Sequence, residues 1–284
     1  MSNKRKIYPK EVETKDLHQF LLGSVSPRPI AFVSTINEEG VANLAPYSFF
    51  NAFSSNPPIL VFSSNRRVRD NTTKDTLANA ILGKEVVINV VNYDIVRQMA
   101  LTSVEFDSSV SEFDMTGLTK VASETVKPPA VMESPVNMEC VVKDIITLGE
   151  HGGAGHLIIC EVQVMHIRED VIDENDRIDP HKMDLMGRMG RAFYVRASGD
   201  AIHTIYQDIK PGVISYTSLP QHVKESKILS ANDVARLAAL RALPTAEELS
   251  AHPKPSSIEG AHAQAKTWIE EGKEGEALAL LMSV

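Results

Sequence analysis

The 284-residue sequence predicts a mainly β protein: an antiparallel barrel of the Greek-key type with short helices, followed by a helical C-terminal extension. Between residues 24 and 200, most apolar segments are short, rich in β-branched residues and bounded by turn residues. They do not alternate regularly with helical segments, as the strands of a parallel α/β sheet would. After residue 215 the sequence becomes alanine-rich and amphipathic, which is typical of helices.

Six segments of the barrel region are predicted strands. They are 30–36, 41–44, 59–63, 85–91, 136–148 and 157–167. The turn 37–40 is expected to join the first two strands, and the glycine-rich segment 151–155 the last two. Both pairs are expected to be antiparallel hairpins, because a parallel crossover needs about a dozen or more residues. The strand 59–63 is expected to begin after Pro58.

Three short helices are expected among these strands, at 15–22, 71–82 and 95–101. Gly23 is the expected stop of the first helix. Asp70 or Asn71 is expected to cap the second helix, and Asp94 the third. The intervening loop 102–135 is long enough to indicate a lid or a partner-binding segment.

The extension is expected to hold further helices at 230–242, after a start at 245–248, at 258–271 and at 274–282. Thr245 and Glu248 form a capping-box pattern at the start of the second. We expect a lead-in over 1–23, a barrel domain over 24–214 and an extension over 215–284, which packs against the main body or a partner subunit.

Composition narrows the classes of function. The 37 acidic residues outnumber the 29 basic ones, so the net charge is −8 and general binding to nucleic acid or to anionic membranes is not expected. No apolar run approaches the roughly 20 residues of a membrane span, and the polar N-terminus does not resemble a secretory signal. Cys140 and Cys160 lie in apolar strands without CxxC spacing, so reduced, buried thiols of a cytoplasmic protein are expected; a disulfide or metal pair is the alternative. No metal site is expected.

Segment 44–51 combines a proline, small residues and aromatic side chains between two strands. Such a segment can offer backbone N–H groups together with an aromatic wall, which suits a flat heterocycle with polar edges. The alternative is an irregular connector that contributes two core phenylalanines, and composition alone favours this connector.

Segment 63–76 concentrates positive charge and hydroxyl groups before a predicted helix. Its cations are Arg66, Arg67, Arg69 and Lys74. Guanidinium groups, hydroxyls and a helix N-terminus together indicate an anion site. The alternative is a solvated basic loop.

His156 begins a strand directly after the glycine-rich turn. A histidine there can donate to a ligand or transfer a proton, although a lone histidine is more often structural. The sequence contains no GxGxxG motif after a strand, no Walker A motif and no GxSxG elbow, so Rossmann, P-loop and α/β-hydrolase sites are not expected.

Seven segments carry a resemblance that covers about residues 24–200. They are Ser-Pro-Arg-Pro-Ile-Ala-Phe-Val-Ser-Thr at 26–35, Gly-Val-Ala-Asn-Leu-Ala-Pro-Tyr-Ser-Phe-Phe-Asn at 40–51, Pro-Pro-Ile-Leu-Val-Phe-Ser at 57–63, Lys-Asp-Thr at 74–76 with Asn79, Val-Ile-Asn at 87–89, Ser-Glu-Phe-Asp-Met-Thr-Gly-Leu at 111–118 and the strand at 156–162. In this order they resemble the flavin reductase-like family of FMN-binding split barrels.

The resemblance implies a homodimer that binds FMN near its interface and transfers hydride from NADH or NADPH to the flavin. Reduced flavin would then serve a partner oxygenase or another electron acceptor. The implied cofactor-binding residues are Arg28, Ala45, Pro46, Tyr47, Ser48, Phe49, Phe50, Asn51, Ser63, Ser64, Arg69, Lys74, Asp75 and Thr76. Segment 45–51 would line the flavin ring, the two serines the ribityl chain, and residues 74–76 the phosphate. His156 would face the nicotinamide as the catalytic residue.

Two departures from the family pattern keep alternatives open. Cys160 stands where the family usually has glycine, and Arg191 replaces a glycine in the closing motif at 187–194. One alternative is a non-catalytic FMN-binding electron carrier, which Cys160 favours. The other is an enzyme similar to pyridoxine-phosphate oxidases on a related barrel, which Arg191 and the phosphate loop support. The segments Ser-Pro-Arg-Pro at 26–29 and Ala-Pro-Tyr-Ser at 45–48 favour the reductase instead.

Overall fold

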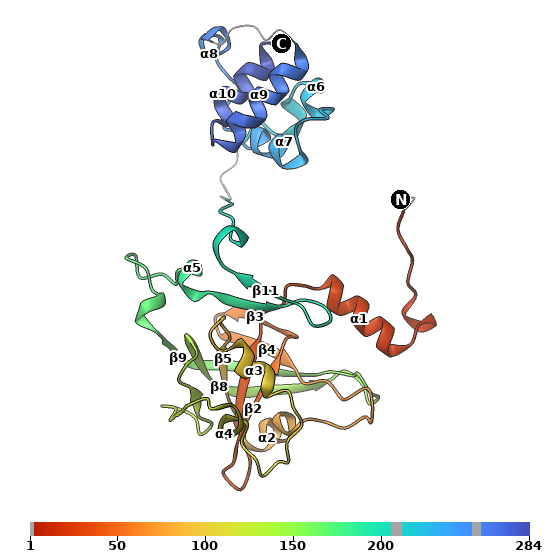
Figure 1. Ribbon diagram of the computed structural model, residues 1–284, viewed down its shortest axis with the longest axis vertical. Coiled ribbons are helices and arrows are strands. Elements are labelled where there is room, and N and C mark those ends of the chain that lie inside the picture. Colours follow the sequence, from red (N-terminus) through yellow and green to blue (C-terminus); the bar gives the residue numbers. More distant parts are fainter. Residues whose placement is uncertain (1–2, 206–211, 252–256) are drawn as a thin grey trace. The chain divides into compact units, whose positions relative to one another are not determined.

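The computed structural model describes residues 3–205, 212–251 and 257–284. The chain forms two compact units, Met1–Thr204 and Ile205–Val284 (Figure 1). This division lies ten residues before the predicted boundary between 214 and 215, and it groups the N-terminal lead-in with the barrel. No helix in the described ranges is long and apolar enough to cross a membrane.

Unit 1 is built on a seven-stranded antiparallel sheet in the order β2-β1-β5-β8-β9-β4-β3. Its strands are β1 (Ala31–Ile36), β2 (Ala42–Tyr47), β3 (Phe50–Ser55), β4 (Pro58–Ser63), β5 (Glu85–Val90), β8 (Val136–Thr147) and β9 (His156–Ile167). Two small pairs accompany it, β6 (Lys120–Val121) with β7 (Ala130–Val131) and β10 (Leu185–Arg188) with β11 (Tyr194–Ala197). The predicted mainly antiparallel β fold with a helical C-terminal region is therefore confirmed.

The six predicted strands and both predicted hairpins are present. Strand β3 was not predicted, and the interpretation of segment 44–51 as an irregular connector is wrong. Residues up to Tyr47 continue β2, and β3 begins at Phe50, opposite Phe62 of β4. Strand β4 begins at Pro58 itself, one residue earlier than predicted.

Short helices surround the sheet. They are α1 (Thr14–Ser24), α2 (Asp75–Gly83), α3 (Val96–Leu101), α4 (Glu112–Thr116) and α5 (Pro180–Met183), with 3-10 turns at Pro9–Glu11, Glu169–Val171 and Gly199–Ala201. The predicted caps Asp70 and Asn71 are wrong, because Asp70 instead accepts from the backbone N–H of Thr72 at 3.0 Å and closes a turn before the helix. Asp94 does not cap α3, and α1 continues one residue beyond Gly23.

Apolar side chains form clusters on both faces of the central strands. Ala31 and Val33 of β1 join one cluster, whereas Phe32 between them joins the other, as strand alternation requires. Cys140 and Cys160 are free and fully buried in the first cluster, as predicted. Burial raises the pKa of the Cys140 thiol to about 12, which keeps it unreactive at neutral pH.

Unit 2 is a small helical domain with its own core. Its helices are α6 (Gln221–Lys224), α7 (Ala231–Ala238), α8 (Ala246–Ala251), α9 (Ile258–Glu270) and α10 (Glu274–Met282), after a 3-10 turn at Tyr216–Ser218. Leu237, Ile269 and Leu278 are fully buried in its centre. The capping box predicted for Thr245 and Glu248 is confirmed, since each side chain bonds the other's backbone N–H.

His262 makes the stability of unit 2 depend on pH. It is 4% exposed; its Nε2 lies 2.9 Å from Nδ1 of His222, and its Nδ1 lies 2.9 Å from Oγ of Ser226. Burial, aided by the charge of His222, lowers the pKa of His262 below its usual 6.5. As the pH falls, the His262 side chain therefore becomes protonated in the unfolded chain before it does in the folded unit. We expect the free energy of unfolding to fall as the pH drops through about 6.5, and to level off once His262 is protonated in the folded unit as well.

The single tryptophan, Trp268, packs against the core of unit 2 and reports its unfolding by fluorescence. Denaturant midpoints measured from about pH 8 to about pH 5 should decline in the wild type and decline less in the His262→Gln variant. Equal slopes for the two proteins would show that His262 does not cause the dependence.

Candidate functional site

The predicted site residues gather where β4 ends beside β9, but they lie on both faces of this strand pair. Ser63 pairs with Leu157, and the next residue, Ser64, exchanges backbone hydrogen bonds with His156 at 3.1 and 3.2 Å. Because consecutive strand residues point to opposite faces, Ser63 and Ser64 serve two different environments.

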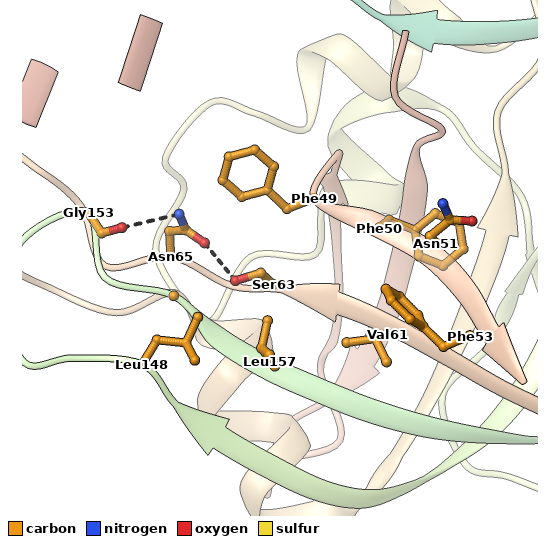
Figure 2. Close-up of a pocket in the computed structure, with 11 residues that line it drawn as sticks. Phe49, Phe50, Asn51, Phe53, Val61, Ser63, Asn65, Leu148, Gly153 and Leu157 are labelled. Atoms are coloured by element: carbon orange, nitrogen blue, oxygen red, sulfur yellow. Dashed lines mark hydrogen bonds between the residues drawn. The ribbon is translucent and has the colours of Figure 1, made fainter. Parts of the chain in front are cut away.

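On one face, an outer cavity of about 370 Å³ opens beside β3 and β4 (Figure 2). Its lining residues are Phe49, Phe50, Asn51, Phe53, Val61, Ser63, Asn65, Leu148, Gly153, Gly155 and Leu157. Ser63 donates to Oδ1 of Asn65 at 2.8 Å, and Asn65 in turn donates to the carbonyl of Gly153 at 3.3 Å. The cavity therefore has an aromatic wall with a few fixed polar groups, and it contains four of the predicted cofactor-binding residues.

Gly155 allows the turn before β9 to approach β4 closely. A Cβ atom at this position would lie 2.5 Å from Oγ of Ser63, well inside contact distance. We expect Gly155→Ala to break the Ser63–Asn65 hydrogen bond and to lower the free energy of unfolding by about 1–3 kcal/mol. Thermal unfolding checks this against Gly83→Ala, where the added methyl meets nothing within 4 Å; equal melting temperatures would contradict it.

On the inner face, Tyr47, Ser64 and Lys74 form a group that we call the donor cluster. The hydroxyls of Tyr47 and Ser64 are buried and have no hydrogen-bond partner among the described residues. Lys74 Nζ lies 4.9 Å from the centre of the Tyr47 ring and makes no hydrogen bond or ion pair within the described ranges. Two hydroxyl donors and an ammonium thus stand together with unused hydrogen-bonding capacity.

Burial sets the protonation of this cluster. It raises the pKa of Tyr47 to about 12. The neighbouring hydroxyls of Thr76 and Ser64 lower this pKa again, but only in part. Neither of them is in hydrogen-bond geometry with the Tyr47 hydroxyl. Burial, followed by the charge of Arg67, lowers the pKa of Lys74. Helix α2 begins at Asp75, and its first backbone N–H groups have no partner inside the helix. Protonated donors and a helix N-terminus at one place suit an anion.

The hydroxyl of Thr76, which was predicted to contact the phosphate, already has a hydrogen-bond partner in the protein. This hydroxyl is buried and donates to Oδ1 of Asn43 at 2.8 Å, so only the backbone N–H of Thr76 remains for an anion. Glu112 holds this arrangement: its carboxylate accepts from Asn43 Nδ2 at 2.9 Å and from the Leu44 N–H at 2.8 Å. Sequence reasoning did not identify Asn43 or Glu112 as site residues, although both lie in segments that carry the resemblance.

The basic loop is partly neutralised by acidic residues. Arg67 and Arg69 both pair with Glu105, at 2.9 and 3.0 Å, and Arg69 also pairs with Asp70. The Arg69 side chain is 69% exposed and lies outside the donor cluster. Arg66 differs, because its Nε is buried and has no partner in the described part of the chain.

Arg28 acts as a clamp. Its guanidinium donates to the carbonyls of Leu22 at 2.7 Å, of Val25, and of Met189 at 2.9 Å, and it lies 5.9 Å from the centre of the Phe49 ring. Most of its N–H groups are therefore used to hold the end of α1 against the turn between β10 and β11.

The other predicted site residues described here contact other parts of the protein. His156 is 5% exposed, and its Nδ1 lies 3.0 Å from the Ser64 carbonyl, on the face opposite the outer cavity. This contact positions Ser64; the catalytic role of His156 stays a prediction. Ala45 and Pro46 lie in β2, the first strand of the sheet order, and pair with β1, and Asp75 is the exposed first residue of α2.

Comparison with known proteins matches residues 22–183 to the "Flavin reductase like domain". An uncharacterized protein of Aquifex aeolicus is 37% identical over 191 residues, which cover 67% of this chain and 95% of that protein. The structure of nitrilotriacetate monooxygenase component B from Bacillus cereus is 32% identical with a TM-score of 0.66, covering 73% of this chain and all of that one.

A second solved structure, 2-nitrobenzoate 2-nitroreductase of Pseudomonas fluorescens, is 30% identical with a TM-score of 0.64 and covers 73% of this chain and 98% of that one. A protein of Shewanella frigidimarina with a split barrel domain, 22% identical with a TM-score of 0.61, shares the fold and covers 72% of this chain and all of that one. The predicted split barrel is thereby confirmed.

Proposed function

Because the chain belongs to the flavin reductase-like family and is a flavin-related oxidoreductase, we propose that its flavin is FMN and that NADH or NADPH reduces it. The observation that best supports FMN is the donor cluster of Tyr47, Ser64 and Lys74 at the start of α2. A terminal phosphate needs such a group of donors, and here two buried hydroxyls without a partner in the described ranges lie beside an unpaired ammonium and a helix N-terminus.

The donor cluster fits a phosphate chemically. Each buried donor without a partner costs about 1–3 kcal/mol, and an anion that accepts from it relieves that cost. Lys74, Ser64 and the first N–H groups of α2 would hold the phosphate. Glu112 and Asn43 would fix the helix start by accepting and donating the hydrogen bonds described above.

The outer cavity suits the flavin ring. Phe49 and Phe50 provide an apolar wall, and Ser63 lies at the strand end directly before Ser64, where the two environments meet. When bound, FMN would supply the redox chemistry by taking electrons from the reduced nicotinamide and passing them to an acceptor. The chain's own residues would orient the ring and shield it from water.

The acceptor is proposed to be a partner oxygenase or another electron acceptor in the cytoplasm. One structural relative is itself a component of a monooxygenase, and another is a nitroreductase. The two buried, unbridged cysteines suit a reducing compartment.

A second candidate function, an FMN electron carrier without a nicotinamide site, is favoured by the burial of His156 and its bond to Ser64. Anaerobic stopped-flow mixing of the FMN-loaded protein with NADH or NADPH separates the two functions. Loss of the flavin's visible absorbance on the timescale of turnover supports a reductase. No loss of absorbance, together with tight FMN binding, supports the carrier.

We also propose a homodimer with the flavin near its interface. Strand β3 is the last strand in the sheet order. Its residues 51–55 are all exposed, and the side chain of Phe53 is 68% exposed. An exposed apolar edge strand invites pairing with another chain, and Phe53 also lines the outer cavity.

Light scattering tests the dimer. The wild type should have twice the chain mass of 31.2 kDa, and Phe53→Glu should shift the protein towards the monomer. Leu101→Glu, at a similarly exposed apolar position on α3, should leave the dimer intact. A monomeric wild type would contradict the proposal.

A further inference from the structure

A second cavity of unit 1, which we call the arginine cavity, lies between the end of α1 and the β10–β11 turn. It measures about 510 Å³, and its walls include Gln19, Gly23, Met189, Arg191, Phe193 and Tyr194. The two walls are closely packed at one point, since a Cβ atom on Gly190 would lie 3.3 Å from the Cα of Gly23. Figure 1 shows α1 running towards this hairpin. The proposed FMN contacts do not use this cavity.

Positive charge around the arginine cavity has no counter-ion. Arg28, Arg188 and Arg191 make no ion pair with any carboxylate in the described ranges. Arg66, Arg97 and Arg177 also make none there, but these three do not line the cavity, whereas Arg67, Arg69, Arg168, Arg196 and Arg236 each have a carboxylate partner. Arg28 is 5% exposed, so a buried guanidinium is balanced only by carbonyl and hydroxyl dipoles. In a chain of net charge −8, such a group creates a local positive field that attracts an anion.

Arg191 lies in the turn between β10 and β11 with a strained backbone. Its φ is +54°, in the left-handed region that favours glycine, and the side chain makes no hydrogen bond or ion pair among the described residues. A glycine would adopt this backbone conformation with less strain. The exposed side chain of Arg191 therefore makes no hydrogen bond or ion pair that would stabilise the described part of the fold.

Aromatic side chains accompany these arginines. Phe193 is 64% exposed and Tyr194 is 36% exposed, and both line the cavity. The guanidinium of Arg188 lies 4.6 Å from the centre of the Tyr194 ring and donates to the Phe193 carbonyl at 3.1 Å. Exposed rings that can stack on a base, beside guanidinium groups that can bind phosphate, suit a phosphorylated nucleoside better than a bare anion.

Arg28 connects this cavity with the outer cavity. Its guanidinium donates to the carbonyl of Met189, which lines the arginine cavity, and it lies over the ring of Phe49, which lines the outer cavity. Arg28 thus contacts one lining residue of each cavity, although it lines neither cavity itself. A ligand with two ends, one flat and uncharged and the other phosphorylated, could reach both.

We propose that the arginine cavity binds the adenosine end of the reduced dinucleotide, and that Arg191, which lines the cavity, recognises a phosphate on its 2′ position. Arg188 holds the Tyr194 ring and the Phe193 carbonyl beside it. The chain would then prefer NADPH to NADH. The proposal rests on the proposed function to the extent that a nicotinamide dinucleotide is the electron donor.

Calorimetry on the full-length protein tests the cavity without any flavin chemistry. The probes are 2′,5′-ADP and 5′-ADP, which carry the same number of phosphate groups in different places. We expect 2′,5′-ADP to bind at least about tenfold more tightly, because charge-assisted bonds to the 2′-phosphate are absent with 5′-ADP. Equal affinities would mean a general anion site and would overturn the proposal.

Arg191→Gly is the decisive variant, because glycine tolerates the backbone of this turn and the fold should melt no earlier than the wild type. It should lose the tenfold preference, whereas Arg191→Lys should retain part of it. Arg177→Ala removes an exposed arginine that lines neither cavity and should leave both affinities unchanged. An unchanged preference in Arg191→Gly would overturn the role of Arg191.

Kinetics separate this inference from the proposed function. With FMN bound, the ratio of kcat/KM for NADPH to that for NADH should fall by about tenfold or more in Arg191→Gly. If neither dinucleotide reduces the flavin while 2′,5′-ADP still binds in the Arg191-dependent manner, the reductase proposal fails and the nucleotide site stands. If both dinucleotides react equally well in the wild type, the reductase stands and the 2′-phosphate site fails.

Discussion

Replacing Lys74 by methionine is expected to weaken FMN binding by roughly ten- to a hundredfold, because a charge-assisted hydrogen bond contributes about 1.5–3 kcal/mol. Methionine keeps much of the apolar stem that packs over the Tyr47 ring but removes the ammonium. The Lys74 side chain does not cap α2, so the helix should remain intact.

Titration of the protein with FMN, followed by quenching of flavin fluorescence, measures this loss. Lys127→Met removes an exposed lysine outside the donor cluster and should bind FMN like the wild type. Ser64→Ala should give a smaller loss, because a neutral hydrogen bond contributes about 0.5–1.5 kcal/mol. Wild-type affinity in Lys74→Met would place the phosphate elsewhere.

The same titration should depend on pH in a direction set by Lys74. Burial lowers the pKa of Lys74 in the free protein, and a bound phosphate would favour its charged form. FMN affinity should therefore decline as the pH rises and free Lys74 loses its proton, and this decline should be smaller in Lys74→Met. Identical pH profiles for the two proteins would contradict the contact.

The largest loss of stability is expected for Arg28→Met. The substitution leaves the carbonyls of Leu22, Val25 and Met189 without their charged donor, and we expect the free energy of unfolding to fall by about 3–5 kcal/mol. Arg28→Lys should recover only part of this, because an ammonium cannot span the same acceptors as a planar guanidinium.

Denaturant unfolding followed by circular dichroism of the sheet measures the effect of Arg28→Met. Fluorescence of Trp268, which lies in unit 2, provides an internal control and should keep its midpoint. A loss below about 1 kcal/mol would show that the carbonyls find other donors and that Arg28 is not the clamp.

Patterning along single strands explains what the sequence could predict. Strand β5 is a nearly continuous apolar run, and β8 and β9 are long segments rich in apolar residues on either side of a glycine-rich turn, so their existence and the β8–β9 pairing followed from local residues. Strand β3 was missed because both of its faces are exposed, which removes the apolar alternation on which prediction depends. The late start of α2 was missed because Asp70 bonds to Thr72 in a turn that competes with the helix.

The candidate site was less predictable than the fold, because its chemistry depends on partners distant in the sequence. The resemblance identified Thr76 but could not show that Asn43 uses its hydroxyl, or that Glu105 binds the arginines of the basic loop. Similarly, the resemblance placed Arg28 near the flavin but could not show that its guanidinium also holds Met189, 161 residues away in the sequence. Only the folded chain shows which donors of a basic segment remain free.

The most direct test of the account is an equilibrium titration of the purified full-length protein with FMN. We expect saturable binding of one FMN per chain, with quenching of flavin fluorescence and a visible spectrum altered by the aromatic wall of the outer cavity. Material that stays colourless after incubation with excess FMN and removal of the free flavin, and that gives no heat in calorimetry, would contradict it.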